Sequence, residues 1–480
     1  MISLPPQSTS KPDLEIKGGY VWWIASVAAL GGLLFGWDWV VIGGAKPFFE
    51  RFFHIQNDAV LSGWVNSCAL IGCLLGALTA GALSDRFGRK RLLIAAAGLF
   101  AVTSVGNGLA NSFDVFVFWR MLGGMAIGLA SSLSPMYISE VAPASMRGRL
   151  VAINQLTIVV GVLSAQIINW TLVRDLPAGA TDAYITASWF GREGWRWMFA
   201  LTSVPSLLFF AGMLAVPESP RWLVKMGFQD RARAVLVRIG GGTYADAELR
   251  DVRATLIHEV KGRVQFSDFL DPGLRRVLLL GVILAIFQQW CGINVIFNYA
   301  EEIFRSAGYD ISSVVQNIAW TGSVNLAFTF VALGLVDKAG RRPLMLVGAF
   351  GLAAVYGVLG ICYYNKVSGL PVLLLVLAAI AVYAMSLAPV TWVVISEIFP
   401  NRIRGAAMSL AVAALWVGCF LLTYTFPLLN ATLGPAGTFW LYAVICIVGG
   451  LYIFFKLPET RGRTLEEIES DLCACSGERK

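Results

Sequence analysis

The sequence predicts an all-α membrane protein with twelve transmembrane helices in two six-helix lobes. The chain of 480 residues is 57% hydrophobic and only 14% charged, and its mean hydropathy is +0.69. Apolar runs long enough to cross a bilayer recur along the chain, and motifs of the first half recur in the second. A soluble domain needs far less apolar surface to fill one core, so the excess must face lipid.

A helix needs about 20 apolar residues to cross the hydrocarbon core of a bilayer. The polar N-terminal segment is followed by an apolar run longer than that of a cleavable signal peptide, so we expect the first span to be retained. The twelve expected spans lie near residues 21–45, 60–83, 92–110, 115–136, 151–172, 197–216, 276–298, 311–335, 343–363, 371–395, 405–428 and 438–457.

A charged stretch divides the two halves, because residues 217–275 mix many Arg and Lys side chains with acids. This composition predicts a cytoplasmic helical linker. If both termini are cytoplasmic, most of the 37 Lys and Arg residues fall on the cytoplasmic side, as the positive-inside rule requires. The expected parts are an N-terminal segment (1–20), an N-terminal lobe (21–216), the linker (217–275), a C-terminal lobe (276–457) and a cytoplasmic tail (458–480).

Charged motifs repeat after equivalent spans of the two halves. The segment 85–91 follows the second span and 337–342 follows the eighth, while an E-x6-R-G motif follows both the fourth and the tenth. Opposite charges at these helix ends can pair across the lobes, which suits a latch that forms when the site faces outward and breaks when it faces inward. The alternative is that they only anchor the topology. The candidate gating residues are Asp85, Arg89, Glu140, Arg147, Asp337, Arg341, Glu397 and Arg404.

Two opposite charges are expected inside the N-terminal lobe. Asp38 lies within the first span and Arg120 within the fourth, where an unpaired charge is costly. The two side chains can pair while Asp38 is ionised and separate when it takes up a proton, as a proton-coupled switch requires. A permanent ion pair that braces the lobe is the alternative.

The C-terminal half carries polar groups suited to a neutral substrate with many hydroxyls. An amide both donates and accepts hydrogen bonds, and a buried unpaired amide costs on the order of 1–3 kcal/mol. Trp392 and Trp416 can stack against a sugar ring, although either one taken alone is more often a packing residue. The five amides in apolar spans are Gln288, Gln289, Asn294, Asn298 and Asn325.

Other functions find little support. The chain has no P-loop, Gly-x-Ser-x-Gly or zinc-ligand spacing at a usable position, which argues against an ATP-driven pump and against an enzyme. We expect no cofactor, no metal and no nucleic-acid partner, and a monomer in the lipid bilayer. Cys473 and Cys475 form a C-x-C pair that would bind metal or respond to redox state only in a minor interpretation.

Together the motifs resemble the sugar porters of the major facilitator superfamily, and among them the bacterial D-xylose/proton symporters. The resemblance covers essentially the whole chain. The segments that carry it are 85–91, 147–149, 217–223, 288–294, 337–342 and 458–462.

The resemblance implies a proton site at Asp38 with Arg120 as its partner, and it adds Glu218 and Arg221 to the gating residues. Facilitative members of the family tend to carry a neutral residue in place of Asp38, which favours symport over uniport. The implied sugar contacts are Phe35, Gln155, Ile158, Gln288, Gln289, Asn294, Asn325, Trp392 and Trp416.

This chain departs from the xylose symporters at Val162, Asn298 and Ala388, where they carry glutamine, tyrosine and glycine, and Trp39 is unusually bulky. We therefore expect import of a pentose or a hexose with a proton, by alternating access in a bacterial inner membrane. The alternatives are a facilitative uniporter, a sugar sensor that retains the fold, and an exporter of hydrophobic compounds.

Overall fold

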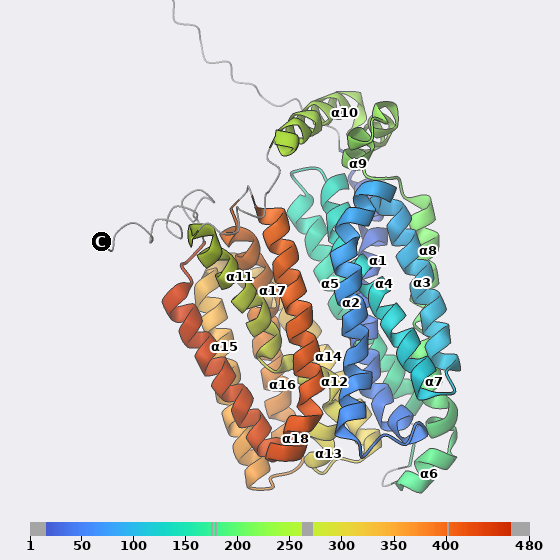
Figure 1. The fold of residues 1–480 in the computed structure, drawn as a ribbon, viewed down its shortest axis with the longest axis vertical. Helices are drawn as coiled ribbons and strands as arrows, with labels where there is room; N and C mark the ends of the chain where they lie inside the picture. Colours follow the sequence, from blue (N-terminus) through green and yellow to red (C-terminus); the bar gives the residue numbers. More distant parts are fainter. Residues whose placement is uncertain (1–15, 174–175, 178–179, 262–271, 401–402, 462–480) are drawn as a thin grey trace, which may run out of the picture.

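The computed structural model describes residues 16–173, 176–177, 180–261, 272–400 and 403–461. Within these ranges the regular secondary structure is entirely helical, and the long helices form two groups side by side (Figure 1). Cys473 and Cys475 lie outside the described residues, so the structure does not bear on their role.

The N-terminal lobe contains six membrane crossings. Five are single long helices, and the sixth runs from Phe190 to Ala215 in three successive pieces. The elements are α1 (Gly18–Phe52), α2 (Ala59–Phe87), α3 (Arg89–Leu109), α4 (Phe113–Val141), α5 (Arg147–Val173), α6 (Asp182–Ala187), η1 (Phe190–Gly194), α7 (Trp195–Ala200) and α8 (Ser203–Ala215).

The C-terminal lobe contains the other six crossings. Eleven helices of the described residues are long and apolar enough to cross a membrane, and the last of them, α18, has 53 residues. Such a helix would be about 80 Å long, and it is broken at Gly434, so it crosses twice and the predicted twelve spans are confirmed. The elements are α11 (Pro272–Trp290), α12 (Ile293–Asn298), α13 (Ala300–Ser306), α14 (Ile311–Ala339), α15 (Arg341–Tyr364), α16 (Leu370–Met385), α17 (Leu387–Ile398) and α18 (Arg404–Lys456).

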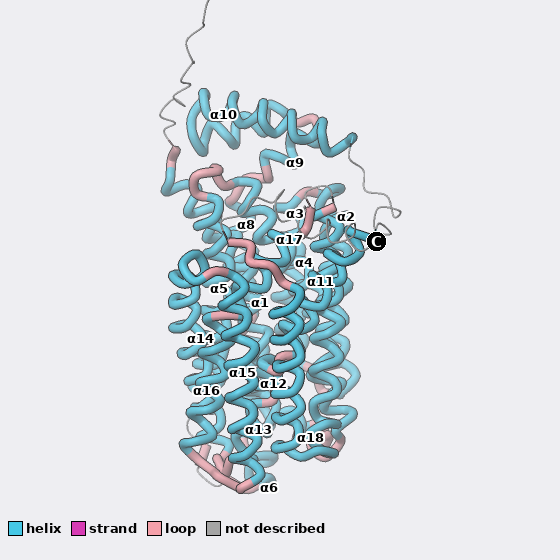
Figure 2. Tube along the Cα trace, turned by 90° about the vertical axis from the view of Figure 1, so that its left-hand side faces the viewer, coloured by secondary structure: helices cyan, strands magenta, loops and turns pink. Residues whose placement is uncertain are grey.

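Two further helices, α9 (Pro220–Lys225) and α10 (Gln229–Lys261), lie over one end of the bundle (Figures 1 and 2). This end is called the linker side below. The backbone N–H of Lys17 donates to the carbonyl of Ile239 across 2.8 Å, so α1 begins on the linker side. The chain bends within α10 at Gly240 and Gly241.

Small residues let the helices of a lobe approach closely. A Cβ on Gly72 or Gly76 of α2 would overlap the backbone of α4, and a Cβ on Gly124 or Gly128 of α4 would overlap the backbone of α2. Because association of helices in lipid relies on van der Waals packing, such contacts hold the lobe together.

The helix boundaries differ from the expected spans in two informative ways. The seventh span is broken at Gly292, whose φ of +87° favours glycine, and the tenth is broken at Ser386. The first span was expected to end at residue 45, but α1 continues to Phe52 and buries Lys46, Glu50 and Arg51. These charges stay in the helix because ion pairs compensate their burial.

The two lobes pack through α2 against α18, α5 against α14, and α1 against α12 and α13. On the side opposite the linker the two backbones nearly touch. A Cβ on Gly43 would overlap the carbonyl of Phe297, and one on Gly63 would overlap the carbonyl of Tyr424. The lobes are therefore tightly joined on that side.

Candidate functional site

Three of the five predicted amides form a hydrogen-bonded chain in the C-terminal lobe. Asn294 donates to the side-chain oxygen of Gln289, and Gln289 Nε2 donates to Gln288 Oε1 across 3.0 Å. Gln288 in turn makes a long contact of 3.4 Å with the carbonyl of Ala388. The break at Gly292 puts the amides before and after it within reach of each other. All three side chains are buried, so they present a fixed set of donors and acceptors.

Aromatic rings bridge the lobes near the amides' helices. The ring centroids of Phe35 and Trp39 on α1 lie 6.0 and 6.1 Å from that of Trp416 on α18. Phe35 and Trp39 also contact each other edge to face at 5.6 Å. Trp416 therefore packs against aromatic side chains of the other lobe in this conformation, and Trp39 is part of that contact.

The other predicted sugar contacts lie on several helices. Gln155 and Ile158 are half-buried on α5, where the carbonyl of Ile158 contacts Gly36 of α1. Trp392 is half-buried on α17, six residues after the break at Ser386. Asn325 is buried on α14, outside the chain of three amides described above.

Asp38 and Arg120 form a buried ion pair inside the N-terminal lobe. Arg120 Nη1 lies 3.0 Å from each carboxylate oxygen of Asp38. The two residues are only 6% and 4% exposed, and the guanidinium carbon lies 5.4 Å from the centroid of the Phe199 ring. The structure thus brings the two predicted charges together, with Asp38 as the acceptor.

A cavity of about 20 Å³ lies beside this pair, which is room for roughly one water molecule. Asp38, Ile42 and Arg120 line it from the N-terminal lobe, and Asn298 lines it from the C-terminal lobe. The side-chain oxygens of Asn298 and of Asn66, another lining residue, are buried and have no hydrogen-bond partner among the described residues. The structure therefore places Asn298 beside the ion pair, whereas the sequence grouped it with the sugar amides.

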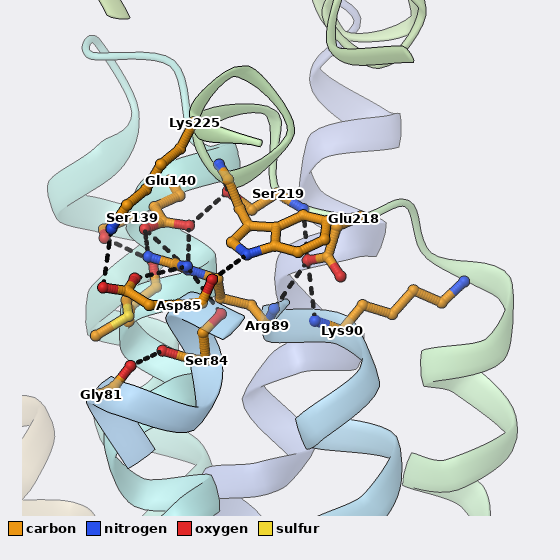
Figure 3. Close-up of polar contacts among 12 residues, drawn as sticks. Gly81, Ser84, Asp85, Arg89, Lys90, Ser139, Glu140, Glu218, Ser219 and Lys225 are labelled. Carbon is orange, nitrogen blue, oxygen red and sulfur yellow. Dashed lines mark hydrogen bonds and ion pairs between the residues drawn. The ribbon is translucent and has the colours of Figure 1, made fainter. Parts of the chain in front are cut away.

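A polar network joins the linker-side ends of α2, α3 and α4 (Figure 3). Arg89 Nε lies 3.0 Å from a carboxylate oxygen of Glu140, and Arg89 also contacts Asp85 at 3.2 Å. Glu218 accepts the backbone N–H groups of Arg89 and Lys90, each at 3.0 Å, at the N-terminus of α3. This carboxylate compensates the unpaired N–H groups and the positive end of the helix dipole. Ser219 completes the network by donating its hydroxyl proton to Glu140 across 2.5 Å.

The C-terminal lobe carries the same network. Arg341 Nη2 lies 3.2 Å from Glu397, and Thr460 Oγ1 donates to Glu397 across 2.5 Å. Glu459 accepts the backbone N–H groups of Arg341 and Arg342, at 3.0 and 3.1 Å, at the N-terminus of α15. Burial acts to raise the pKa of the Glu459 carboxyl, but these N–H groups and that of Arg461 outweigh it and hold the pKa below its ordinary value.

The remaining predicted gating residues also lie on the linker side. Arg404 donates to the carbonyl of Phe399 at 3.1 and 3.2 Å, and Arg147 interacts electrostatically with Tyr244 and Glu248 of α10. Arg221 lies in α9, and the side chain of Asp337 is outside the described part of the chain. The contacts described for Arg89, Glu140, Arg341, Glu397 and Arg404 all join residues of one lobe.

Sequence reasoning missed a third internal repeat. Pro217-Glu218-Ser219 after the sixth span and Pro458-Glu459-Thr460 after the twelfth play the same part in the two networks. The signal in the sequence is the recurrence of Pro-Glu followed by Ser or Thr at the end of each half. Aligning the ends of the two halves would have revealed Ser219, Glu459 and Thr460.

Comparison with known proteins gives a family match over nearly the whole chain. The family described as "Sugar (and other) transporter" matches residues 24–472. The D-xylose-proton symporter of Escherichia coli (strain K12) is 38% identical, over 95% of this chain and 97% of that protein. The glucose transport protein of Synechocystis sp. is 38% identical over 97% and 100% of the two chains, and the arabinose-proton symporter of Bacillus subtilis is 38% identical over 94% and 95%.

The fold is also similar to a solved transporter. A structure of the E. coli xylose transporter in an inward open conformation is 38% identical, covers 94% of this chain and 99% of the other, and has a TM-score of 0.81. This agreement confirms the two-lobed arrangement predicted from the repeated motifs.

Proposed function

Because the chain belongs to the sugar transporter family of the major facilitator superfamily, we propose that it imports a pentose or a hexose together with a proton. Sugar transport follows from the family, since the relatives named above carry xylose, glucose or arabinose in their names. The choice of sugar and the coupling to protons rest on the residues of this chain.

The observation that supports proton coupling is the buried pair of Asp38 and Arg120 beside a small cavity. A carboxylate in this position can lose its charge only by taking up a proton, which would release Arg120. A purely structural brace could be replaced by apolar packing at little cost. The cavity also reaches Asn298 of the other lobe. Protonation of Asp38 can therefore affect α12, the helix that carries both Asn298 and Asn294.

The amide chain supports a neutral polyhydroxylated substrate. Gln288, Gln289 and Asn294 lie next to the breaks in the seventh and tenth spans, and discontinuous helices of this kind typically form the substrate sites of transporters. Trp392 and Trp416 provide apolar faces for a sugar ring. Discrimination among pentoses and hexoses then depends on single hydroxyl contacts.

We place the linker side in the cytoplasm, because the Arg- and Lys-rich loops lie there. The lobes meet tightly on the opposite side, and the fold is similar to an inward open transporter, so this conformation is inward-facing. In the outward-facing state Glu140, Arg147, Glu397 and Arg404 would pair across the lobes as the latch.

The test uses purified protein in proteoliposomes with an imposed pH gradient, acidic outside, and labelled xylose, arabinose and glucose. We expect at least one sugar to accumulate above equilibrium. Asp38→Asn should abolish accumulation but retain exchange of sugar between the two sides. Asp246→Asn, an exposed acid of the linker paired with Arg233, is the matched control and should accumulate sugar normally.

Normal accumulation by Asp38→Asn would refute coupling through this residue. Equilibration without accumulation by the unmodified protein would instead identify a uniporter, in which Asp38 only braces the lobe. Failure to bind or move any monosaccharide would refute the assignment of the substrate class.

A further inference from the structure

A second set of buried charges lies on the side opposite the linker, in the last two turns of α1. Lys46, Glu50 and Arg51 are 2%, 4% and 5% exposed. Lys46 Nζ lies 2.9 Å from Glu50 Oε2, and Glu50 Oε1 accepts the hydroxyl of Ser62 at 2.6 Å. Arg51 Nη2 lies 2.9 Å from Asp182. Nothing in the transport site described above uses these groups.

The same cations also bind the other lobe. Lys46 forms an ion pair with Glu302 of α13 and lies 4.0 Å from Glu301, and Arg51 Nη1 lies 3.6 Å from Glu301 Oε1. The ring of Tyr299, which is fully buried, lies 5.5 Å from Lys46 Nζ. The lobes are therefore joined here by direct ion pairs, unlike the linker-side networks, whose described contacts stay within one lobe.

Lys46 and Glu50 lie on the same face of α1 as the proposed proton site, Asp38. Asp38, Ile42, Lys46 and Glu50 are four residues apart, so they lie on one face of α1. The facing segment carries Asn298 and Glu302, also four apart. Asn298 meets Asp38 at the cavity and Glu302 meets Lys46, so the ion pair lies about two turns of α1 outward of Asp38.

We propose that Lys46 and its partners Glu301 and Glu302 form the outer gate of the transporter, an ion lock that closes the Asp38 cavity to the outside and opens to admit a proton. The proposal rests on the proposed function. The Lys46 side chain is 3% exposed and that of Glu302 is 26% exposed, and an ion pair largely removed from water suits a gate, since its attraction roughly offsets the cost of that removal. The closed and open states then differ little in free energy, and small changes at the transport site can shift the equilibrium.

The experiment measures how fast Cys73, a buried residue that lines the Asp38 cavity, reacts with a membrane-impermeant thiol reagent from the outside. Right-side-out membrane vesicles are used, and modification of Cys73 is quantified by mass spectrometry. Cys73→Ser verifies the assignment of the signal. Removing one partner of a buried pair destabilises the paired state strongly, so Lys46→Met should raise the labelling rate by about tenfold.

Three further variants make this result specific. Glu302→Gln keeps the size of the side chain and removes one charge, so it should raise the labelling rate several-fold even if Lys46→Met folds poorly. The double variant Lys46→Met/Glu302→Gln should bring the rate back toward that of the unmodified protein. Arg305→Met is the matched control, because Arg305 also contacts Glu301 at 3.3 Å but its side chain is 47% exposed.

Unchanged labelling in correctly folded Lys46→Met and Glu302→Gln would overturn the proposal, and the cluster would then be a static brace. This readout does not depend on the sugar or on coupling. If labelling of Cys73 rises in the variants as expected but the unmodified protein does not accumulate sugar, the proposed gate is supported and the proposed proton-coupled transport is refuted.

Discussion

The two lobes are alike at their linker-side ends and different at their centres. At the ends, Arg89, Glu140 and Glu218 of the first lobe match Arg341, Glu397 and Glu459 of the second, contact by contact. At the centre, the first lobe holds the ion pair of Asp38 and Arg120, whereas the second holds broken helices and a chain of amides. In the function proposed above, the repeat is retained at the ends that would form the latch, and it is lost at the centres, where one lobe would bind the proton and the other the sugar.

The first test concerns the centres of the two lobes and asks whether sugar binding and proton coupling depend on different residues. Gln288→Ala would leave Gln289 without its acceptor and Trp392→Ala would remove an aromatic face, so each should weaken sugar binding by about tenfold or more. The number of protons carried with each sugar should not change, because both residues belong to the C-terminal lobe. Isothermal titration and pH-gradient uptake measure the two quantities.

Asn107→Ala is the matched control for these variants, since Asn107 is a buried amide of α3 in the other lobe. Its sugar affinity should equal that of the unmodified protein. Unchanged affinity in both Gln288→Ala and Trp392→Ala would place the pocket elsewhere.

The largest expected change in stability tests whether the linker-side networks of the two lobes are equally strong. Arg89→Ala leaves Glu140 buried with the Ser219 hydroxyl but without its cationic partner, and the side chains of Arg89 and Glu140 are 8% and 7% exposed. We expect a loss of stability of about 3 kcal/mol. The matching pair Arg341 and Glu397 is 15% and 23% exposed, so Arg341→Ala should cost on the order of 1 kcal/mol.

Thermal unfolding in detergent, followed by intrinsic tryptophan fluorescence, compares the two variants under the same conditions. Arg89→Ala should unfold at the lower temperature. The reverse order would show that exposure of the ion pair does not govern the strength of these networks.

The smallest effect is expected at the helix N-termini, where the two lobes should respond equally. Glu218→Gln and Glu459→Gln keep the acceptor oxygen but remove the charge, so each should cost about 0.5–1 kcal/mol. Glu218 and Glu459 accept comparable sets of backbone N–H groups. Unequal losses of stability in the two variants would therefore show that the two networks are not equivalent.

The pH dependence of the Glu459 effect has a definite sign. The pKa of Glu459 in the folded protein is held below its ordinary value of 4.5, so the carboxylate stabilises the fold above that pH and loses this contribution as the pH falls through the lowered pKa. The difference in stability between the unmodified protein and Glu459→Gln should therefore shrink below about pH 4.5. A difference that grows in acid would contradict the assigned hydrogen bonds.

Some features followed from the sequence because they are local. A helix in lipid must satisfy its own backbone hydrogen bonds, so apolar runs of about 20 residues sufficed to predict the spans. The charged motifs after the second and eighth spans showed the two-lobed repeat, which the fold confirms. Asp38 and Arg120 stood out because charges are rare inside spans, and the structure brings them together.

What the tertiary structure decided depends on residues far apart in the chain. Two charges, Lys46 and Glu50, indicate the end of a span in the sequence. They are buried in the structure because they pair with each other and Lys46 pairs with Glu302, which the sequence does not show. The sequence groups Asn298 with the other amides of the C-terminal half, and only the packing of the lobes shows that it lines the cavity beside Asp38. Hydropathy and motifs determined which segments cross the membrane, whereas the packing of one lobe on the other determined which charges and amides meet, because such contacts leave no periodic signal in the sequence.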